Sequence, residues 1–339
     1  MIEVIENKEK WDELISLFEK SDLYHTFDYH HITKDDGKPV LLKYCDDDIC
    51  IALPLLIRKI LNSSFYDATS VYGYPGPLSK NLPESFDTSS FSKCLHQYFA
   101  DSNIVSVFSR LNPFISNQQK VLNGIGMVQR KGSIVSIDLK KDVNQQRREF
   151  SSRLKGQLNK SRRYCTVKKA VDDAEYHDFI KIYHENMDRV NAQEMYYFDD
   201  YYFKVLAKSE SFNTETLLAI DNESGQTVGA SMFIYKNAVI HYHLSGTRGD
   251  SLHMMPTKLL IDEMRLKASQ LGLSHFNLGG GLGSADDSLL RFKSSFSKNL
   301  MDFHVWKLIV LPDVYKTLTN GVHRSGEVDF FPSYRFKKT

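Results

Sequence analysis

The sequence predicts an α/β protein with mixed sheets, built from two domains of the same plan. The chain has 339 residues, which is long for one ordinary domain and suits two of middling size. Apolar residues recur at helical spacing in some segments and form short extended runs in others. The resulting order of helices and strands occurs twice along the chain. We therefore expect a first domain over residues 1–145 and a second domain over residues 146–339.

The first half begins with a helix and a hairpin. Apolar residues from Trp11 to Phe18 fall at positions i, i+3, i+4 and i+7, which form one face of a helix. Two apolar stretches, residues 40–44 and 49–57, flank three consecutive aspartates, and this pattern predicts a hairpin turn. Apolar runs then predict strands near residues 65–71, 104–108 and 134–139, with helices near residues 91–98 and 118–122.

The second half repeats this order. An apolar stripe from Tyr176 to Met187 predicts a first helix, and residues 201–208 predict a second. A longer helix should begin at Pro256, a residue that suits a first turn, and end before Gly272. Three strands should precede this helix, at residues 216–220, 228–235 and 238–244. After it we expect a strand at 275–278, a helix at 286–297 and a last strand at 303–310.

Composition excludes several classes of protein. The 43 lysines and arginines are balanced by 42 acids, so no global field attracts nucleic acid, and we expect neither DNA nor tRNA as a partner. The chain starts without the basic and apolar parts of a signal peptide, and its longest apolar run, residues 51–57, is too short to cross a membrane. We expect a cytoplasmic protein without a metal site, in which Cys45, Cys50, Cys94 and Cys165 are plain thiols.

The segment between the halves is strongly basic. Residues 147–170 carry nine lysines or arginines and a single acid, Glu149. We interpret the segment either as a solvated connecting helix or as a basic rim that attracts the phosphates of a substrate or coenzyme.

Short motifs in the second half carry a family resemblance. They are His-Tyr-His-Leu-Ser-Gly-Thr at residues 241–247, Phe-Asn-Leu-Gly-Gly-Gly at residues 276–281 and Ser-Leu-Leu-Arg-Phe-Lys at residues 288–293. Together they resemble the FemAB-like branch of the GNAT (Gcn5-related N-acetyltransferase) superfamily, which includes peptidoglycan bridge aminoacyltransferases and other tandem-GNAT N-acyltransferases. Residues 72–78, 110–113, 187–192 and 196–198 are similar to further motifs of this branch.

The resemblance implies two tandem GNAT-like domains with an active site in or beside the cleft between them. An amine would attack a thioester or ester directly, without an acyl-enzyme. The sequence lacks the long helical insert that some bridge-forming enzymes use to meet tRNA. It also lacks the glycine-rich pyrophosphate signature of GNAT enzymes, and residues 247–255 stand near that place.

Two residues are candidates for the chemistry. His241 and His243 alternate with Tyr242 and should share one face of their strand, and imidazole is the usual base near neutral pH. We favour His243 as the base, and the alternative is a structural, hydrogen-bonded histidine with water as the proton carrier. Lys293, in the family's Phe-Lys pair, would stabilise an oxyanion or a phosphate, and the alternative is an ordinary surface lysine.

The acyl donor should be coenzyme A as a co-substrate, without any tightly bound cofactor. A strand end and the start of the next helix should hold it, because unpaired N–H groups and the helix dipole favour a pyrophosphate. The donor residues would be Leu244, Ser245, Gly246, Arg248, Pro256, Thr257 and Lys258.

Acceptor residues are expected in both halves. An arginine such as Arg189 can hold a diphosphate in bidentate fashion, and tyrosines can pack on a base or sugar. Ordinary packing is the alternative for each of them. The acceptor set is Tyr72, Tyr74, Arg189, Asn191, Tyr197, His241 and Asn277.

The preferred function follows from the resemblance. It is transfer of an acyl group from acyl-coenzyme A to the amine of a nucleotide-linked amino sugar, such as a 3-amino-3,6-dideoxyhexose, for a surface polysaccharide such as the lipopolysaccharide O-antigen. One alternative is a tRNA-dependent aminoacyltransferase that acts on a peptidoglycan precursor. The other is a non-catalytic tandem domain that binds a glycan precursor.

Overall fold

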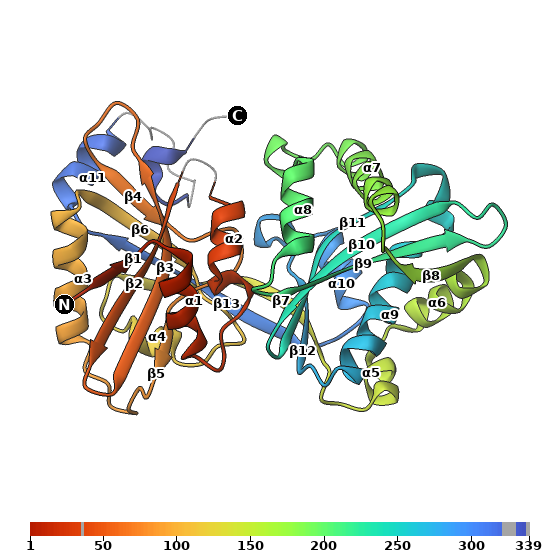
Figure 1. The fold of residues 1–339 in the computed structure, drawn as a ribbon, viewed down its shortest axis with the longest axis horizontal. Coiled ribbons are helices and arrows are strands. Elements are labelled where there is room, and N and C mark those ends of the chain that lie inside the picture. Colours follow the sequence, from red (N-terminus) through yellow and green to blue (C-terminus); the bar gives the residue numbers. More distant parts are fainter. Residues whose placement is uncertain (35–36, 321–329, 337–339) are drawn as a thin grey trace. The chain divides into compact units, whose positions relative to one another are not determined.

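A computed structural model describes residues 1–34, 37–320 and 330–336, and the chain divides into two compact units (Figure 1). Unit 1 comprises Met1–Lys131 and Asp302–Thr339, and unit 2 comprises Gly132–Met301. Each unit combines helices with a mixed sheet, which confirms the predicted fold class. No helix in the described part of the chain is long and apolar enough to cross a membrane.

The described sheet of unit 1 contains a parallel pair, β4 and β6, among antiparallel strands. Its predicted hairpin is present, and Asp46 faces Ile49 across a two-residue turn. The strand order is β1 (Glu3–Ile5), β2 (Lys38–Asp46), β3 (Ile49–Lys59), β4 (Tyr66–Thr69), β6 (Ile104–Arg110) and β13 (Leu300–Ile309), with β5 (Leu78–Lys80) beside β3.

The helices of unit 1 bury the apolar faces that their spacing predicts. Asn7 caps the first helix by accepting a hydrogen bond from the Lys10 backbone N–H, and Trp11 is fully buried beneath it. A second cluster contains Phe91 and Phe99. The helices are α1 (Lys8–Ser16), α2 (Phe27–Ile32), α3 (Ser89–Asp101), α4 (Gln118–Val121) and α11 (Pro312–Thr319).

The sheet of unit 2 also mixes parallel and antiparallel pairs. β11 and β12 run parallel, and β12 pairs antiparallel with β7. The strand order is β7 (Met127–Asp138), β12 (His275–Gly279), β11 (Val239–Thr247), β10 (Thr227–Lys236), β9 (Asn213–Asp221) and β8 (Cys165–Lys169). The helices are α5 (Val143–Glu149), α6 (Ser152–Tyr164), α7 (Asp173–Arg189), α8 (Asp200–Lys208), α9 (Pro256–Gln270) and α10 (Ser288–Ser294).

Short 3-10 helices occur in connecting segments of both units. They are η1 (Leu23–His25), η2 (Glu194–Tyr196), η3 (Gly249–Met254), η4 (Leu282–Ser284) and η5 (Ser333–Arg335). Of these, η3 leads directly into α9 and therefore bears on the position of that helix.

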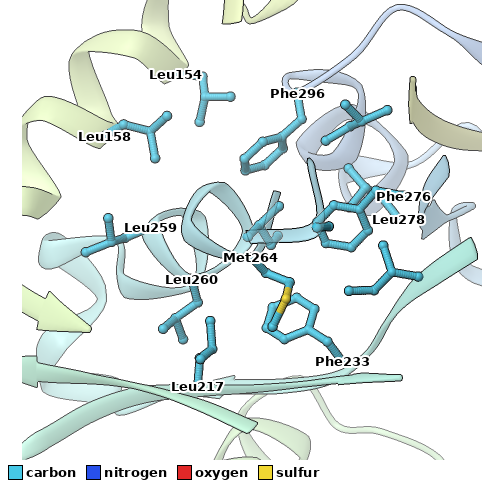
Figure 2. Packing of buried hydrophobic residues seen from close by; sticks show 14 of the residues in the cluster. Leu154, Leu158, Leu217, Phe233, Leu259, Leu260, Met264, Phe276, Leu278 and Phe296 are labelled. Atoms are coloured by element: carbon cyan, nitrogen blue, oxygen red, sulfur yellow. The ribbon is translucent and has the colours of Figure 1, made fainter. Parts of the chain in front are cut away.

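Helix α9 lies at the centre of the core of unit 2 (Figure 2). Its Leu260 and Met264 share one cluster with Phe233 of β10 and Phe276 of β12, and all four are fully buried. Burial of one such side chain stabilises a fold by about 1.5–3 kcal/mol. The same cluster includes Leu158 of α6, so the start of α9 is held between the sheet and α6.

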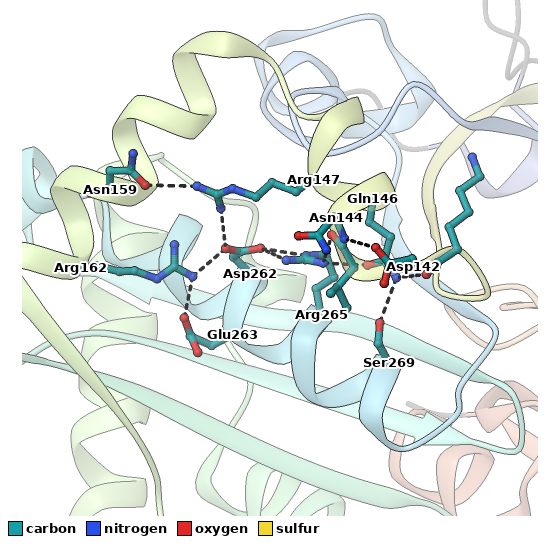
Figure 3. A network of polar contacts seen from close by, with 12 residues as sticks. Asp142, Asn144, Gln146, Arg147, Asn159, Arg162, Asp262, Glu263, Arg265 and Ser269 are labelled. Atoms are coloured by element: carbon teal, nitrogen blue, oxygen red, sulfur yellow. Dashed lines mark hydrogen bonds and ion pairs between the residues drawn. The ribbon is translucent and has the colours of Figure 1, made fainter.

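A buried ion-pair network joins α5 and α6 to α9 (Figure 3). The fully buried carboxylate of Asp262 contacts Arg162 at 2.7 Å, Arg265 at 2.8 Å and Arg147 at 3.6 Å. Loss of one partner would leave a buried charge uncompensated, so the network fixes the three helices together.

The expected single connecting helix over residues 147–170 is wrong. The segment forms the end of α5, the whole of α6 and strand β8. Ser151 starts the second helix by accepting a hydrogen bond from the Leu154 backbone N–H. Arg147 and Arg162 turn inward to Asp262, so this part of the basic segment is a structural contact.

The division of the chain differs from the expected boundary between residues 145 and 146. The borders fall inside β7 and inside β13. The last strand was expected in the second domain, but it pairs antiparallel with β6 in unit 1, where Val305 faces Arg110. Conversely, β7 pairs with β12 in unit 2, where Ile137 faces Phe276. Strand pairing therefore places β13 in unit 1 and most of β7 in unit 2, the reverse of what was expected. Local sequence patterns do not reveal such pairing.

Candidate active site

Two parallel strands of unit 2 separate near their C-terminal ends. In the described register of β11 with β12, Val239 faces His275, and the last facing pair is His241 with Asn277. β11 continues to Thr247, whereas β12 ends at Gly279. A ligand can therefore approach the backbone of β11 on the side that β12 leaves.

A β-bulge lies at the same place in β11. Phe233 of β10 faces Tyr242, and its neighbour Met232 faces Leu244, so His243 is an extra residue in the strand. A bulge disrupts the local ladder and re-aims a side chain, and bulges are over-represented beside active sites.

His243 is half-buried and hydrogen-bonds to Tyr202 of α8, with 2.9 Å between Nε2 and the phenolic oxygen. Ile240 and Tyr242 belong to the cluster around α9, whereas His243 contacts α8. Burial, and then the proximity of His241, lower the pKa of His243 to about 3. A base is most effective when its pKa is near the working pH, so this value favours the structural alternative over the predicted general base.

His241 and Asn277 form a second polar contact between β11 and β12. Asn277 Nδ2 lies 3.1 Å from His241 Nδ1, and Asn277 Oδ1 accepts a hydrogen bond from the Gly279 backbone N–H at 2.8 Å. The two residues are only 2% and 3% exposed, so the structure places them inside unit 2. Direct contact with a large acceptor, as expected from the sequence, is therefore not supported, and they orient the strand end instead.

Lys293 of α10 is buried, which contradicts the surface-lysine alternative. Its ammonium donates to the carbonyl oxygen of Gly280 at 2.7 Å. A Cβ added to Gly279 would lie 3.0 Å from Nζ, so the glycine run allows the lysine to approach the strand end. Burial lowers the pKa of Lys293 to about 8, partly offset by Asp287. The residue is thus a largely protonated ammonium at neutral pH.

The N-terminus of α9 has no side-chain cap in the described structure. Met255 stands at the N-cap with a positive φ of 56°, and Pro256 follows at the first turn. The hydroxyls of Thr247 and Thr257 lie 2.8 Å apart and join the end of β11 to this helix. Lys258 Nζ donates to Gln157 Oε1 at 2.6 Å, and burial and the nearby Arg153 lower its pKa.

The other residues predicted to bind the acyl donor make packing contacts and hydrogen bonds at the end of β11 and in the loop after it. Leu244 is half-buried, and Ser245 hydrogen-bonds to the phenol of Tyr242. A Cβ on Gly246 would lie 2.4 Å from the Ile182 carbonyl oxygen, so glycine is needed for α7 to pack here. Arg248 Nε donates to the Thr227 carbonyl at 2.6 Å and secures the loop.

The remaining acceptor candidates of unit 2 lie at the C-terminus of α7 or in the segment that follows it. Arg189 donates to the Thr247 carbonyl at 2.8 Å and also to Asn186, so its guanidinium is held beside the end of β11. The Tyr197 hydroxyl donates to Asp188 at 2.8 Å. Asn191 adopts a left-handed φ of 47° just after the helix.

Tyr72 and Tyr74 lie in unit 1, in the segment that follows β4. Tyr72 is exposed, and the guanidinium of Arg110 lies 5.5 Å from the centre of its ring. Tyr74 packs edge-on against Phe303 at 5.1 Å. Their role in acceptor binding stays a prediction.

Unit 1 also contains a cavity of about 330 Å³ beside β6 and β13. Buried Asn112 and Gln118 border it, together with Phe303 and His304. Gln118 is fully engaged, since it accepts from the Asn112 backbone N–H and donates to the Pro75 carbonyl. In the described residues no group of three histidine, cysteine or acidic side chains is placed to hold a metal ion.

Two residues near the site were missed from the sequence. Tyr202 lies on the apolar face of α8 with Phe203 and Leu206, so its pattern indicates only packing. Gln157 contacts Lys258 across 101 positions of sequence. The bulge at His243 also left no signal, because an inserted strand residue does not alter the local composition.

Comparison with known proteins agrees with this geometry. Residues 142–293 match the family model described as an acetyltransferase (GNAT) domain. The matched range contains β11, β12, α9 and Lys293, so the candidate site lies within the part of unit 2 that is similar to this family model. No curated protein sequence matches the chain significantly.

Solved structures show the same fold over nearly the whole chain. FemX is similar with a TM-score of 0.70 and 11% identity, covering 93% of this chain and 99% of that one. A conserved protein of unknown function from Bacteroides thetaiotaomicron is similar with a TM-score of 0.58 and 11% identity, covering 91% and 100%. The α/β fold with mixed sheets that the sequence predicts is thus shared with these proteins over nearly the whole chain.

Proposed function

We propose that the protein is an N-acyltransferase that moves an acyl group from acyl-coenzyme A to an amine, and that the reaction takes place in unit 2. One observation carries the proposal. The separation of β11 from β12, the bulge at His243 and the uncapped start of α9 follow one another along the chain, and the buried ammonium of Lys293 lies at the end of β12, the strand that separates from β11.

The start of α9 suits the pyrophosphate of the donor. This helix has 15 residues, and its dipole favours an anion at the N-terminus. Lys258 adds a positive charge in its first turn. The thioester would then lie along the separated part of β11, where its carbonyl oxygen meets the strand backbone.

The chemistry is a direct substitution at the thioester carbonyl. The neutral amine forms a bond to the carbonyl carbon, and the carbonyl electrons move onto oxygen. Collapse of this oxyanion breaks the carbon–sulfur bond, the thiolate leaves, and water or the thiolate takes the amine proton. Lys293 stabilises the oxyanion, and a positioned donor of this kind typically contributes about 10²–10³-fold in rate.

The proposed acceptor is a nucleotide-linked amino sugar, such as a 3-amino-3,6-dideoxyhexose for a surface polysaccharide. The family resemblance supports this choice, as does the guanidinium of Arg189 beside the end of β11. The same segment is rich in acids, which attract the amino group of an acceptor as an ammonium, and this group loses a proton to solvent before it attacks. These acids are Glu185, Asp188, Glu194, Asp199 and Asp200.

Hydrogen exchange in the presence of coenzyme A tests the donor site. We expect slower exchange over residues 243–258 of unit 2. Protection confined to unit 1 would contradict the proposal.

An acceptor panel tests the finer proposal independently. A nucleotide-linked amino sugar, the free amino sugar and a peptidoglycan precursor should be compared at saturating donor. We expect the nucleotide form to react fastest. Equal rates for the free sugar would exclude a diphosphate site at Arg189 while leaving the N-acyltransferase activity intact.

A second candidate function is a tRNA-dependent aminoacyltransferase acting on a peptidoglycan precursor. The likeness to FemX over 93% of the chain favours it. The formal net charge of +1 argues against it, because proteins that bind nucleic acid strongly carry a clear positive excess. Loss of activity after ribonuclease treatment of an active extract would favour this candidate.

A further inference from the structure

A pair of cysteines faces each other across the first hairpin of unit 1. In the register of β2 with β3, Cys45 lies opposite Cys50, one step from the turn pair Asp46 and Ile49. Facing residues of an antiparallel pair point to the same side of the sheet, so both thiols lie on one face. The Cys45 side chain lies close enough to Cys50 to raise the pKa of its thiol.

The position in the hairpin suits a cross-strand bond. Facing pairs alternate between hydrogen-bonded and non-hydrogen-bonded kinds, and the pair that closes a two-residue turn is usually hydrogen-bonded. Cys45 and Cys50 are then a non-hydrogen-bonded pair, whose Cα atoms are typically about 4.5 Å apart. Disulfides span Cα separations of about 4.4–6.8 Å, so a bond needs little movement of the backbone.

The two thiols differ in access. Cys45 is exposed, whereas Cys50 is buried in the cluster that contains Trp11 and Leu14 of α1. Burial, and then the contact with Cys45, raise the pKa of Cys50 to about 12, so Cys50 remains a thiol. Lys43, two positions before Cys45 on the same strand, interacts electrostatically with both sulfurs.

We propose that Cys45 and Cys50 form a reversible dithiol–disulfide site that is oxidised by peroxide. The thiolate of Cys45 attacks one oxygen of hydrogen peroxide, which gives a sulfenic acid and hydroxide. The Cys50 sulfur then attacks the Cys45 sulfur, and water leaves as the disulfide forms. The two thiols lose two electrons and two protons in total, and the peroxide is reduced to two waters.

A metal role fits the pair less well. Soft metals are usually held by three or four cysteine or histidine ligands, and the described residues bring no third such group to the pair. The cysteine pair is therefore assigned to redox chemistry. It lies in unit 1 and does not depend on the function proposed for unit 2.

Peptide mapping of the full chain tests the proposal. Trypsin cleavage after Lys43 and Arg58 releases both cysteines in one peptide, residues 44–58. After brief treatment with hydrogen peroxide and alkylation, this peptide should be two hydrogens lighter and carry no alkyl group. Prior reduction with dithiothreitol should restore two alkylated cysteines.

Matched variants separate the pair from the other thiols. Cys45→Ser and Cys50→Ala should each leave the remaining cysteine open to alkylation after peroxide. A variant with Cys94→Ser and Cys165→Ala should still form the bond. Thermal unfolding of each reduced variant checks that it is folded.

Three results would overturn the proposal. One is full alkylation of residues 44–58 although methionines in the same sample are oxidised. Another is a sulfinic acid at Cys45 with Cys50 still a thiol. The third is a disulfide that joins two chains instead of Cys45 with Cys50.

Discussion

In unit 1, the parallel strands β4 and β6 stay joined beyond the end of β4. The Ser70 backbone N–H donates to the Phe108 carbonyl at 2.9 Å, and the Ser70 hydroxyl accepts from the Arg110 backbone N–H. In unit 2, the corresponding pair stops at His241 and Asn277 while β11 runs on to Thr247. The same strand order can thus give two parallel strands that stay hydrogen-bonded to their ends, as in unit 1, or two that separate, as in unit 2.

The two units also differ at the N-terminus of the helix that lies between these two strands in the chain, which is α3 in unit 1 and α9 in unit 2. Before α3 of unit 1, the carboxylate of Asp87 accepts hydrogen bonds from the Ser89 backbone N–H and hydroxyl. The start of α9 in unit 2 has no such side-chain cap. An anion would have to displace the Asp87 carboxylate in unit 1, whereas no side chain caps the start of α9 in the described structure.

The segment after β4 shows a third difference. Tyr24 covers Gly73, where an added Cβ would lie 2.2 Å from the tyrosine ring. In unit 2, the comparable stretch carries the bulge at His243. A tyrosine fills this position in unit 1, and the difference supports the proposal that the donor site lies in unit 2.

The largest effect should come from Lys293→Met. Loss of the ammonium should lower kcat by about 10²–10³-fold, because the oxyanion loses its charged donor. The matched control is Lys120→Met on α4 of unit 1, whose lysine donates to the Pro83 carbonyl, and it should change kcat little. Steady-state kinetics give kcat for both variants. Equal losses of kcat would contradict a special role for Lys293 in unit 2.

The same substitution should show a pH signature in stability. In the folded state the pKa of Lys293 falls from 10.5 to about 8, so the buried ammonium destabilises the fold at pH 7 by about 3 kcal/mol. This destabilisation is full below the folded pKa and disappears as the pH rises through the unfolded pKa of 10.5. Urea unfolding should find Lys293→Met more stable than the parent at pH 7 and show a shrinking difference above pH 8.

A second substitution gives α9 of unit 2 an aspartate near its N-terminus, like Asp87 before α3 of unit 1. Met255→Asp places a carboxylate at the start of α9, where it repels the donor phosphates, and should raise KM for the acyl donor by about tenfold, the equivalent of about 1.4 kcal/mol. Met255→Asn supplies the same shape without charge and should have a much smaller effect. Equal KM values for the two variants would show that the donor phosphates lie elsewhere.

His243→Ala should have a smaller effect. With a pKa of about 3, His243 is neutral through the working range, so kcat should fall by no more than about tenfold and the pH–rate profile should keep its shape. Tyr202→Phe removes the hydrogen bond to the imidazole and should give a similar change. A loss of about 10²–10⁴-fold would instead establish His243 as the general base.

The smallest effect on activity is expected for Asp87→Ala in unit 1. Hydrogen bonds from Ser89 lower the pKa of Asp87, so its stabilisation is present above the unfolded pKa of 3.8 and is lost as the pH falls below it. The variant should unfold at a slightly lower Tm at pH 7, with no difference at pH 2. Its KM for the acyl donor should equal that of the parent, and a change would link unit 1 to donor binding.

Local patterns predicted most elements because each is encoded by its own residues. The stripe from Trp11 to Phe18 became α1, and the aspartates at the hairpin became its turn, with Asp47 at a positive φ of 48°. The exchange of β7 and β13 was missed because both strands are apolar runs that would suit either sheet. Pairing across more than a hundred residues is not visible in composition.

The candidate site was predicted in part. Motifs indicated the end of β11, the start of α9 and Lys293, and the structure brings these together in unit 2. Their contacts were not predictable, since the burial of His241 and Asn277 and the inward turn of Lys293 depend on tertiary packing. Arg189 was expected to be available for phosphates, yet it already donates to the Thr247 carbonyl.

The exchange of β7 and β13 sets the order in which the chain can mature on the ribosome. Strand β6 leaves the ribosome early, but its partner β13 is made only after all the strands of unit 2. Until then β6 is an open sheet edge, which is prone to pair with other chains. Strand β7 is made before its partner β12, so unit 2 can complete its sheet before β13 completes the sheet of unit 1.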